Sequence, residues 1–92
     1  MQFTKKLREP IKQGEITTSI RIWKHPHVKV GGRYKLDGGY ITVTTIYEIS
    51  LNDVTEKMAK ESGFDSLMDL LKTAKHGSGS LVYFIKFTYN DA

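Results

Sequence analysis

The stretch from residue 14 to 23 carries the clearest pattern of hydrophobic and polar positions in the chain. A glycine ends a helix-like segment, and a segment with strict alternation follows. Because strand side chains alternate between faces, Thr18, Ile20 and Ile22 share one face, which we expect to be buried. The other face suits an anionic, aromatic ligand, because it carries hydroxyls, a guanidinium and an indole. These polar and aromatic residues are Thr17, Ser19, Arg21 and Trp23.

The segment before this strand is predicted to be a short helix over residues 5–13. Leu7 and Ile11 lie four positions apart and would face the core together. Pro10 is acceptable only near the first turn of a helix, because proline lacks the amide hydrogen that later turns need. Gly14 is the predicted C-cap glycine.

The remaining pattern predicts three more strands and two helices. The strands lie at residues 33–36, 40–49 and 81–89, and a hairpin signal at residues 37–39 joins the first two. Two helices follow residue 49, with Asp53 and Asp65 as their predicted caps. Antiparallel pairing is favoured, because only one connection is long enough to hold helices. The sequence therefore predicts a single α+β domain: a small, mostly antiparallel β-barrel with a short N-terminal helix and a two-helix insertion.

Composition narrows the class of protein. The 92 residues include no cysteine, which excludes disulfides, thiolate metal sites and a cysteine nucleophile. There is no long apolar run and no signal-peptide core at the N-terminus, so we expect a cytoplasmic protein without a membrane partner. The net charge of +4, from 14 Lys and Arg against 10 Asp and Glu, mildly favours a nucleic-acid partner.

Basic residues gather in two places along the chain. The first cluster follows the strand at residues 17–23, and the second ends the last predicted helix, where cations also complement the helix dipole. If both clusters flank one groove with Arg21, they make an electrostatic track for an RNA backbone. His25 and His27 lack partners for a metal site, so no metal is predicted, and they are interpreted as loop residues that reach phosphate. The clusters are Lys24, Lys29, Arg33 and Lys35, and Lys72, Lys75 and His76.

Four short motifs follow one another along the chain. They are residues 14–21, Val30-Gly31, Glu61-Ser62-Gly63-Phe64 and Tyr83-Phe84-Ile85-Lys86-Phe87. Their order and spacing, from about Phe3 to Tyr89, resemble the ASCH domain family, whose pattern opens with G-x-K-x-x-x-x-R and continues with a V-G-D motif, a helix ending in E-x-G-F and an aromatic last strand. This resemblance implies a PUA-like barrel fold and association with RNA.

The resemblance also implies a possible hydrolase activity. Some members remove the acetyl group from 4-acetylcytidine, and another is a ribonuclease; both use the motif lysine, which is replaced here by Ile16. The threonine that acts as nucleophile in the acetylcytidine hydrolases corresponds to Ser19, and the motif arginine corresponds to Arg21. The glutamate of those enzymes corresponds to a position at or beside Ser62, next to Glu61. A serine hydroxyl without an adjacent base is a poor nucleophile, so the missing lysine lowers the prospect of catalysis.

Three functional hypotheses follow. The first is a small RNA-binding domain with a cleft between the strand at residues 17–23 and the helical insertion. The second is a hydrolase on RNA or a modified nucleoside, with Ser19 as the nucleophile or as a polar group that orients the substrate, and Glu61 in acid–base catalysis. The third is a small-molecule or protein interaction module that uses the same cleft.

The structural alternatives are an ion-paired Arg21, a Trp23 that covers the barrel end and a solvated helix residue at Glu61. The predicted partner is RNA or a nucleotide, and no cofactor is predicted. The predicted ligand-binding residues are Ser19, Arg21, Trp23, Lys24, His25, Lys29, Arg33, Lys72, Lys75 and His76.

Overall fold

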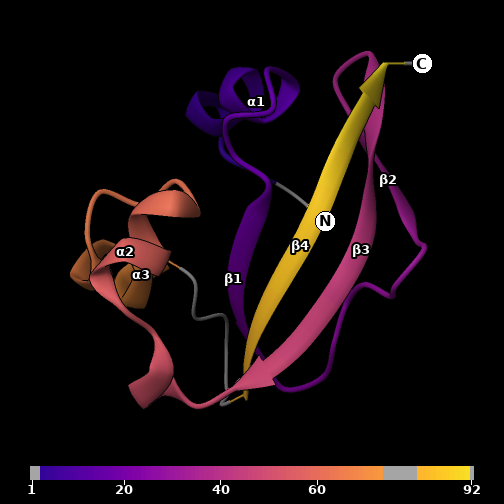
Figure 1. The fold of residues 1–92 in the computed structure, drawn as a ribbon. Helices are drawn as coiled ribbons and strands as arrows, with labels where there is room; N and C mark the ends of the chain where they lie inside the picture. The colour runs from indigo at the N-terminus through magenta and orange to yellow at the C-terminus, as the bar shows by residue number, and fades with distance from the viewer. Residues whose placement is uncertain (1–2, 74–80, 92) are drawn as a thin grey trace.

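The computed structural model describes residues 3–73 and 81–91. Four strands and three α-helices make up this part of the chain (Figure 1). In chain order the elements are α1 (Lys5–Lys12), β1 (Thr18–Trp23), β2 (Arg33–Leu36), β3 (Gly39–Ile49), the 3-10 turn η1 (Leu51–Asp53), α2 (Glu56–Glu61), α3 (Leu67–Thr73) and β4 (Leu81–Asp91).

The four strands form one antiparallel sheet in the order β1-β4-β3-β2. The C-terminal strand β4 therefore lies between β1 and β3, and the sheet curls into a half-barrel (Figure 1). A register shift between Val43 and Thr45 marks a bulge in β3, which increases the local twist. The predicted α+β class and antiparallel pairing are confirmed. In the described residues the sheet stays open between its two edge strands, β1 and β2.

The inner face of the half-barrel is covered by the N-terminal segment and α1. Phe3 packs against Phe87 with 5.5 Å between the ring centroids. Asp37, in the turn between β2 and β3, forms ion pairs with Arg8 at 3.4 Å and Lys12 at 3.6 Å. The inner face is thereby closed at this end. The buried residues beneath α1 are Phe3, Ile11, Leu36, Ile41 and Phe87.

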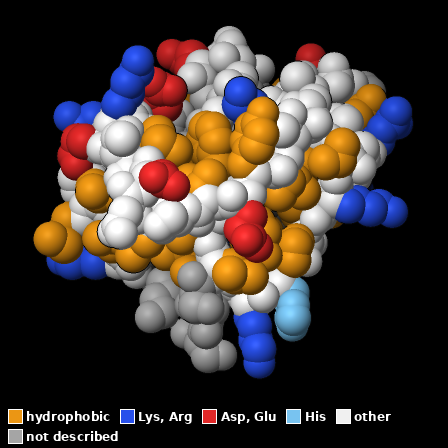
Figure 2. Space-filling view, turned by 60° about the horizontal axis from the view of Figure 1, so that its bottom comes forward, with side chains coloured by type: hydrophobic (Ala, Val, Ile, Leu, Met, Phe, Trp, Pro, Cys, Tyr) orange, Lys and Arg blue, Asp and Glu red, His pale blue; other side chains and the backbone are white. Residues whose placement is uncertain are grey.

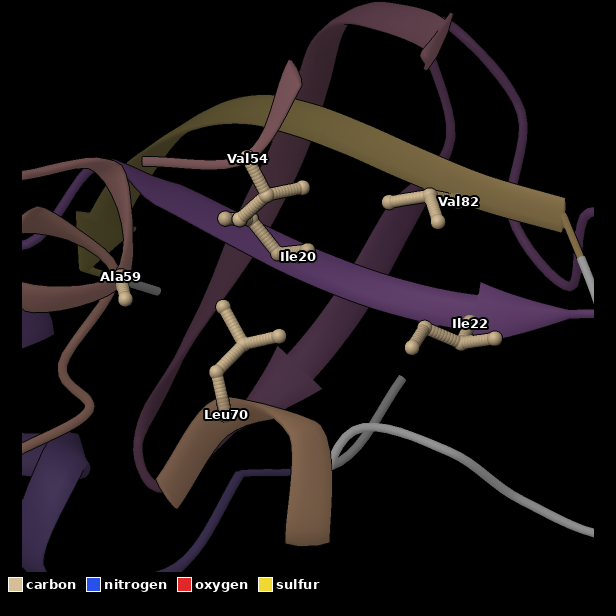
Figure 3. Close-up of a cluster of buried hydrophobic side chains, with 6 residues drawn as sticks. All are labelled: Ile20, Ile22, Val54, Ala59, Leu70 and Val82. Atoms are coloured by element: carbon tan, nitrogen blue, oxygen red, sulfur yellow. The ribbon is translucent and has the colours of Figure 1, made fainter. Parts of the chain in front are cut away.

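The outer face of β1 is covered by the helical insertion. Leu70 of α3 and Ala59 of α2 pack against Ile20 and Ile22, and Figure 3 shows these side chains converging with Val54 and Val82. Ile20, Ala59 and Leu70 are each 0% exposed. The aliphatic face of β1 was predicted to be buried, and this is confirmed.

Helix boundaries follow the sequence prediction, but two caps do not. Gly14 has a φ of 77° and lies just after α1, as the prediction of a C-terminal glycine requires. Thr55 caps α2 by accepting a hydrogen bond from the Met58 amide, whereas Asp53 belongs to the preceding turn η1. Ser66 accepts from the Asp69 amide at the start of α3, where Asp65 was the predicted cap. Thr55 and Ser66 act as the caps because each hydroxyl belongs to the residue directly before its helix.

Pro10 lies inside α1 rather than in its first turn. The helix loses one backbone hydrogen bond there, yet it persists because Leu7 and Ile11 pack onto the sheet. The Pro10 carbonyl accepts hydrogen bonds from the Glu15 and Ile16 amides at 2.9 and 3.3 Å. Tertiary packing therefore stabilises a helix that local preference disfavours.

Candidate nucleic-acid interface

Ser19 and Arg21 lie side by side on the inner face of β1. Arg21 Nε donates a hydrogen bond of 2.9 Å to Ser19 Oγ, and the guanidinium carbon lies 5.0 Å from the centroid of the Phe3 ring. Ser19 is 4% exposed. Burial lowers the pKa of Arg21, although a guanidinium stays charged at neutral pH. The N-terminal segment thus covers the polar pair that the sequence analysis assigned to a ligand.

Trp23 is a packed core residue at the end of β1. It is 4% exposed, and the ring of His27 stacks on it with 4.5 Å between centroids and 15° between planes. The ring of Tyr83 also lies 6.0 Å from the indole, in a tilted arrangement. The indole therefore serves packing and is closed to a stacking base in this arrangement.

The predicted cleft between β1 and the helical insertion is wrong. The helices pack on the face that carries Ile20 and Ile22. Ser19 and Arg21 alternate with these residues and so point to the opposite side of the strand. Core side chains fill the space between the helices and β1, and the predicted floor of the cleft lies on the other face of the sheet.

The predicted catalytic pair is also not brought together. Glu61 is exposed at the end of α2 and forms an ion pair of 3.8 Å with Lys57. Its neighbour Ser62 shares a hydrogen bond of 2.9 Å with Thr18, whose side chain lies on the face of β1 opposite to Ser19. The group that donates to Ser19 Oγ is a guanidinium, which cannot accept a proton. Ile16, at the motif-lysine position, packs against the buried cluster beneath α1.

The inner face also holds a polar contact between Tyr83 and Glu48 that was not predicted from the sequence. Tyr83 is 6% exposed, and burial raises the pKa of its phenol, as do the charge of the Glu48 carboxylate and the hydrogen bond to it. The two residues are direct partners across β3 and β4. Sequence alone gives no signal for this pairing, because the residues are far apart along the chain.

The predicted basic residues spread over the molecule. Lys24, His25 and Lys29 are exposed in the connection between β1 and β2. Arg33 lies on the edge strand β2, whereas Lys72 belongs to α3, which packs over the opposite edge strand β1. Arg33 and Lys72 therefore lie at opposite edges of the sheet. Lys75 and His76 lie outside the described residues.

A different surface combines aromatic rings with cations. We call it the open outer face, meaning the outer face of β2, β3 and β4 beyond the helices. The strand register places its rings and cations on one side of the sheet. Its aromatic residues are Tyr40, Tyr47 and Phe84, and its cations are Arg33, Lys35 and Lys86.

The rings and cations of this face contact one another. The Arg33 guanidinium carbon lies 5.0 Å from the centroid of Tyr40, and Lys86 Nζ lies 5.7 Å from that of Tyr47. Tyr47 stacks on Phe84 with 6.5 Å between centroids and 19° between planes. Tyr47 is 49% exposed, whereas Phe84 is partly buried and packs against the cluster beneath the helical insertion. The pair is therefore accessible from solvent through its tyrosine.

The described strand positions of the open outer face carry positive charge only. The strand residues that share it, in the described part of β2, β3 and β4, include no Asp or Glu. Between the aromatic positions lie polar uncharged side chains, namely Thr42, Thr45, Thr88 and Asn90. A positive, hydrogen-bonding surface with at least partly exposed rings, here exposed Tyr47 and half-buried Tyr40 and Phe84, is what a single-stranded nucleic acid requires. The sequence prediction did not include this face, although the alternation of Phe84 and Lys86 with buried Ile85 is a sequence signal for it.

Apolar side chains continue from this face toward the lower end of the molecule. Figure 2 shows hydrophobic side chains gathered across the middle of that end, with most Lys and Arg side chains at its periphery. Leu51 and Leu81 are 49% and 38% exposed.

Comparisons of the chain with protein-family models, with curated proteins and with solved structures find no match. In the part of the chain that the structure describes, no three His, Cys, Asp or Glu side chains gather in a position to hold a metal ion. Among the same residues, no helix has both the length and the apolar character needed to span a membrane. Functional inference therefore rests on this chain's own residues and geometry.

Proposed function

We propose that this domain binds single-stranded RNA on the open outer face. The observation that carries the proposal is the set of three aromatic rings and three cations on one side of the sheet, without an acidic residue among the strand positions that share that side. Bases stack on the rings, and Arg33, Lys35 and Lys86 neutralise phosphates. This arrangement keeps the RNA-binding hypothesis and moves the surface away from β1.

The physical chemistry of the face supports this ligand class. Stacking of one base on an aromatic side chain contributes about 1–3 kcal/mol. Bases in a single strand can splay outward and reach such rings, and exposed sheets with aromatic residues are one way in which proteins bind RNA. The threonine hydroxyls between the rings can donate to phosphates or accept from ribose hydroxyls.

We also propose that the chain is a diverged ASCH domain with a PUA-like half-barrel. Support comes from the element order, which follows the resemblance: α1 precedes β1, the helix α2 runs into the segment Glu61-Ser62-Gly63-Phe64, and an aromatic strand ends the sheet. Association with RNA, as the family resemblance implies, agrees with the proposed function. The hydrolase hypothesis lacks an assembled pair of catalytic groups and is not carried forward.

The proposal is tested by fluorescence anisotropy with a labelled, unstructured RNA at low salt. Tyr47→Ala and Lys86→Gln should each weaken binding by about tenfold, because a stacking ring or a phosphate contact is lost. Met68→Ala is the matched control, since it removes a side chain that is 63% exposed on α3, away from the open outer face.

Circular dichroism and thermal melting check that each variant is folded. Equal loss in the Met68 control would point to a general effect on the protein. Failure of the wild-type protein to bind any RNA at low salt would refute the function. If substitutions at Tyr47 and Lys86 leave RNA affinity unchanged while substitutions at Lys24 or Lys72 weaken it, the interface is the surface predicted from the sequence.

A further inference from the structure

The open outer face carries a ring with a cation on it near each end of β3. Near the start of the strand, Arg33 lies over Tyr40 at 5.0 Å. Near its end, Lys86 lies over Tyr47 at 5.7 Å, and Tyr47 also stacks on Phe84. We infer that these are two separate base-stacking stations, and that the ligand is a single strand long enough to occupy both. This inference rests on the proposed binding of single-stranded RNA and adds the number of stacking positions and the length of strand that they require.

The spacing of the stations sets the length of strand that bridges them. Tyr40 and Tyr47 belong to the same strand, and a separation of seven residues spans roughly 23 Å in an extended chain. The bulge between Val43 and Thr45 shortens this path. Stacked nucleotides advance about 3.4 Å each, so about six stacked nucleotides connect the stations and fewer suffice when the strand is extended.

Each station has the parts needed to hold one nucleotide. A guanidinium plane is itself a stacking surface for a base, so Arg33 and Tyr40 together offer an extended platform. At the other station, the stacked pair of Tyr47 and Phe84 offers ring surface, while the Lys86 ammonium supplies a charge for a phosphate. The stretch between the stations is lined by the threonine side chains described above.

The two-station arrangement excludes other forms of nucleic acid as the preferred ligand. A base-paired helix keeps its base faces inside the stack, where the tyrosine rings do not reach them. A single nucleotide fills one station and gains nothing from the other. A strand that reaches both gains from effective concentration, because its second contact is intramolecular.

A length series of labelled, unstructured RNA oligonucleotides tests the inference. Lengths run from about two to about twelve nucleotides, which brackets the predicted site size. The affinity of the wild-type protein should rise by about tenfold or more up to about six nucleotides and then level off. Tyr40→Ala and Tyr47→Ala should each abolish this rise, so that a hexamer binds about as weakly as a dimer.

Two further variants keep the test independent of folding. Arg33→Gln probes the Tyr40 station through an exposed side chain and should reduce the rise without changing thermal stability. Met68→Ala should leave the rise intact. A duplex RNA of matched length should bind at least about tenfold more weakly than the single strand.

A flat length dependence, or a rise that survives both Tyr40→Ala and Arg33→Gln, would overturn the two-station inference while RNA binding itself stands. A duplex that binds as tightly as the single strand would overturn it as well. If no oligonucleotide of any length or form binds, the proposed function fails together with the inference.

Discussion

Individual residues on β1 show how the same side chain changes role with its surroundings. Arg21 and Trp23 are residue types that often bind ligands. In this structure the Arg21 guanidinium packs against Phe3, and the Trp23 indole packs against His27. A buried guanidinium remains charged, so it needs compensation by hydrogen bonds and ring contacts. Here Ser19 and Phe3 provide part of that compensation.

Arg21→Ala is therefore expected to reduce stability more than RNA affinity. The variant loses the hydrogen bond to Ser19 and the ring contact with Phe3, and we expect it to lower the free energy of unfolding by about 1–3 kcal/mol. Urea denaturation measures this loss, and anisotropy at a temperature where the variant is folded measures the affinity. A folded, equally stable variant with tenfold weaker RNA binding would restore Arg21 to the interface.

Tyr83 gives the protein a distinctive response to alkaline pH. Its phenol pKa is raised in the folded state by burial and by Glu48, so its stabilising contribution is fully present below the unfolded pKa of about 10. That contribution is lost as pH rises through the folded pKa. The wild type should therefore lose stability relative to Tyr83→Phe above about pH 10. Denaturation curves of both proteins across this range would contradict the assignment if their difference stayed constant.

The connection after α2 depends on a backbone conformation and a close contact that glycine allows. Gly63 follows α2 with a φ of 92°. A Cβ atom at this position would lie 2.6 Å from Leu7 Cδ2 and 3.1 Å from Ile16 Cδ1. The end of α2 therefore packs directly against α1 and the segment that connects α1 to β1, and glycine at this point sets how closely they approach.

Gly63→Ala should cost more stability than Gly14→Ala, which makes a matched pair. Both positions have positive φ, at 92° and 77°, so both variants carry the cost of about 1–2 kcal/mol for a left-handed residue with a side chain. A Cβ added at Gly14 has no atom within 4 Å, whereas a Cβ added at Gly63 also forces the Leu7 side chain to move. Thermal or urea denaturation of the two variants measures the difference. Equal losses would mean that the α1–α2 contact adapts without strain.

At the scale of the whole molecule, the helices decide which part of the sheet remains accessible. α1 and Phe3 cover the inner face, while α2 and α3 cover the outer face of β1. The outer face of β2, β3 and β4 is left open, with the positive charge on it concentrated in three side chains. The proposed function depends on this arrangement, because only the face that the helices leave open can contact RNA.

RNA binding should show a salt dependence set by the three cations of the open outer face. If Arg33, Lys35 and Lys86 each neutralise one phosphate, the slope of log affinity against log salt should be about −2 for a single strand. Changing all three to glutamine should bring the slope near zero. The control changes Lys5, Lys57 and Lys60 to glutamine, which removes the same charge from α1 and α2. A control that flattens the slope equally would assign binding to net charge alone.

The sequence by itself determined the elements and much of the core. Alternation predicted the strands, glycines and the i, i+4 pattern predicted the first helix, and the aliphatic face of β1 is buried as expected. These features are local: a period of two or of about four residues fixes which side chains share a face. The two caps and Pro10 departed from prediction, because neighbouring hydroxyls and tertiary packing override weak local preferences.

Only the tertiary structure decided which faces meet solvent. Alternation shows that a strand has two faces, but it does not show what covers each one. In this chain Phe3 lies against Arg21, and Ser19 is buried, which covers the predicted site. By contrast, the strand register joins Tyr47 to Phe84 and Lys86 from distant parts of the sequence. The candidate interface depends on these long-range pairings, since it consists of side chains from three strands that no local pattern connects.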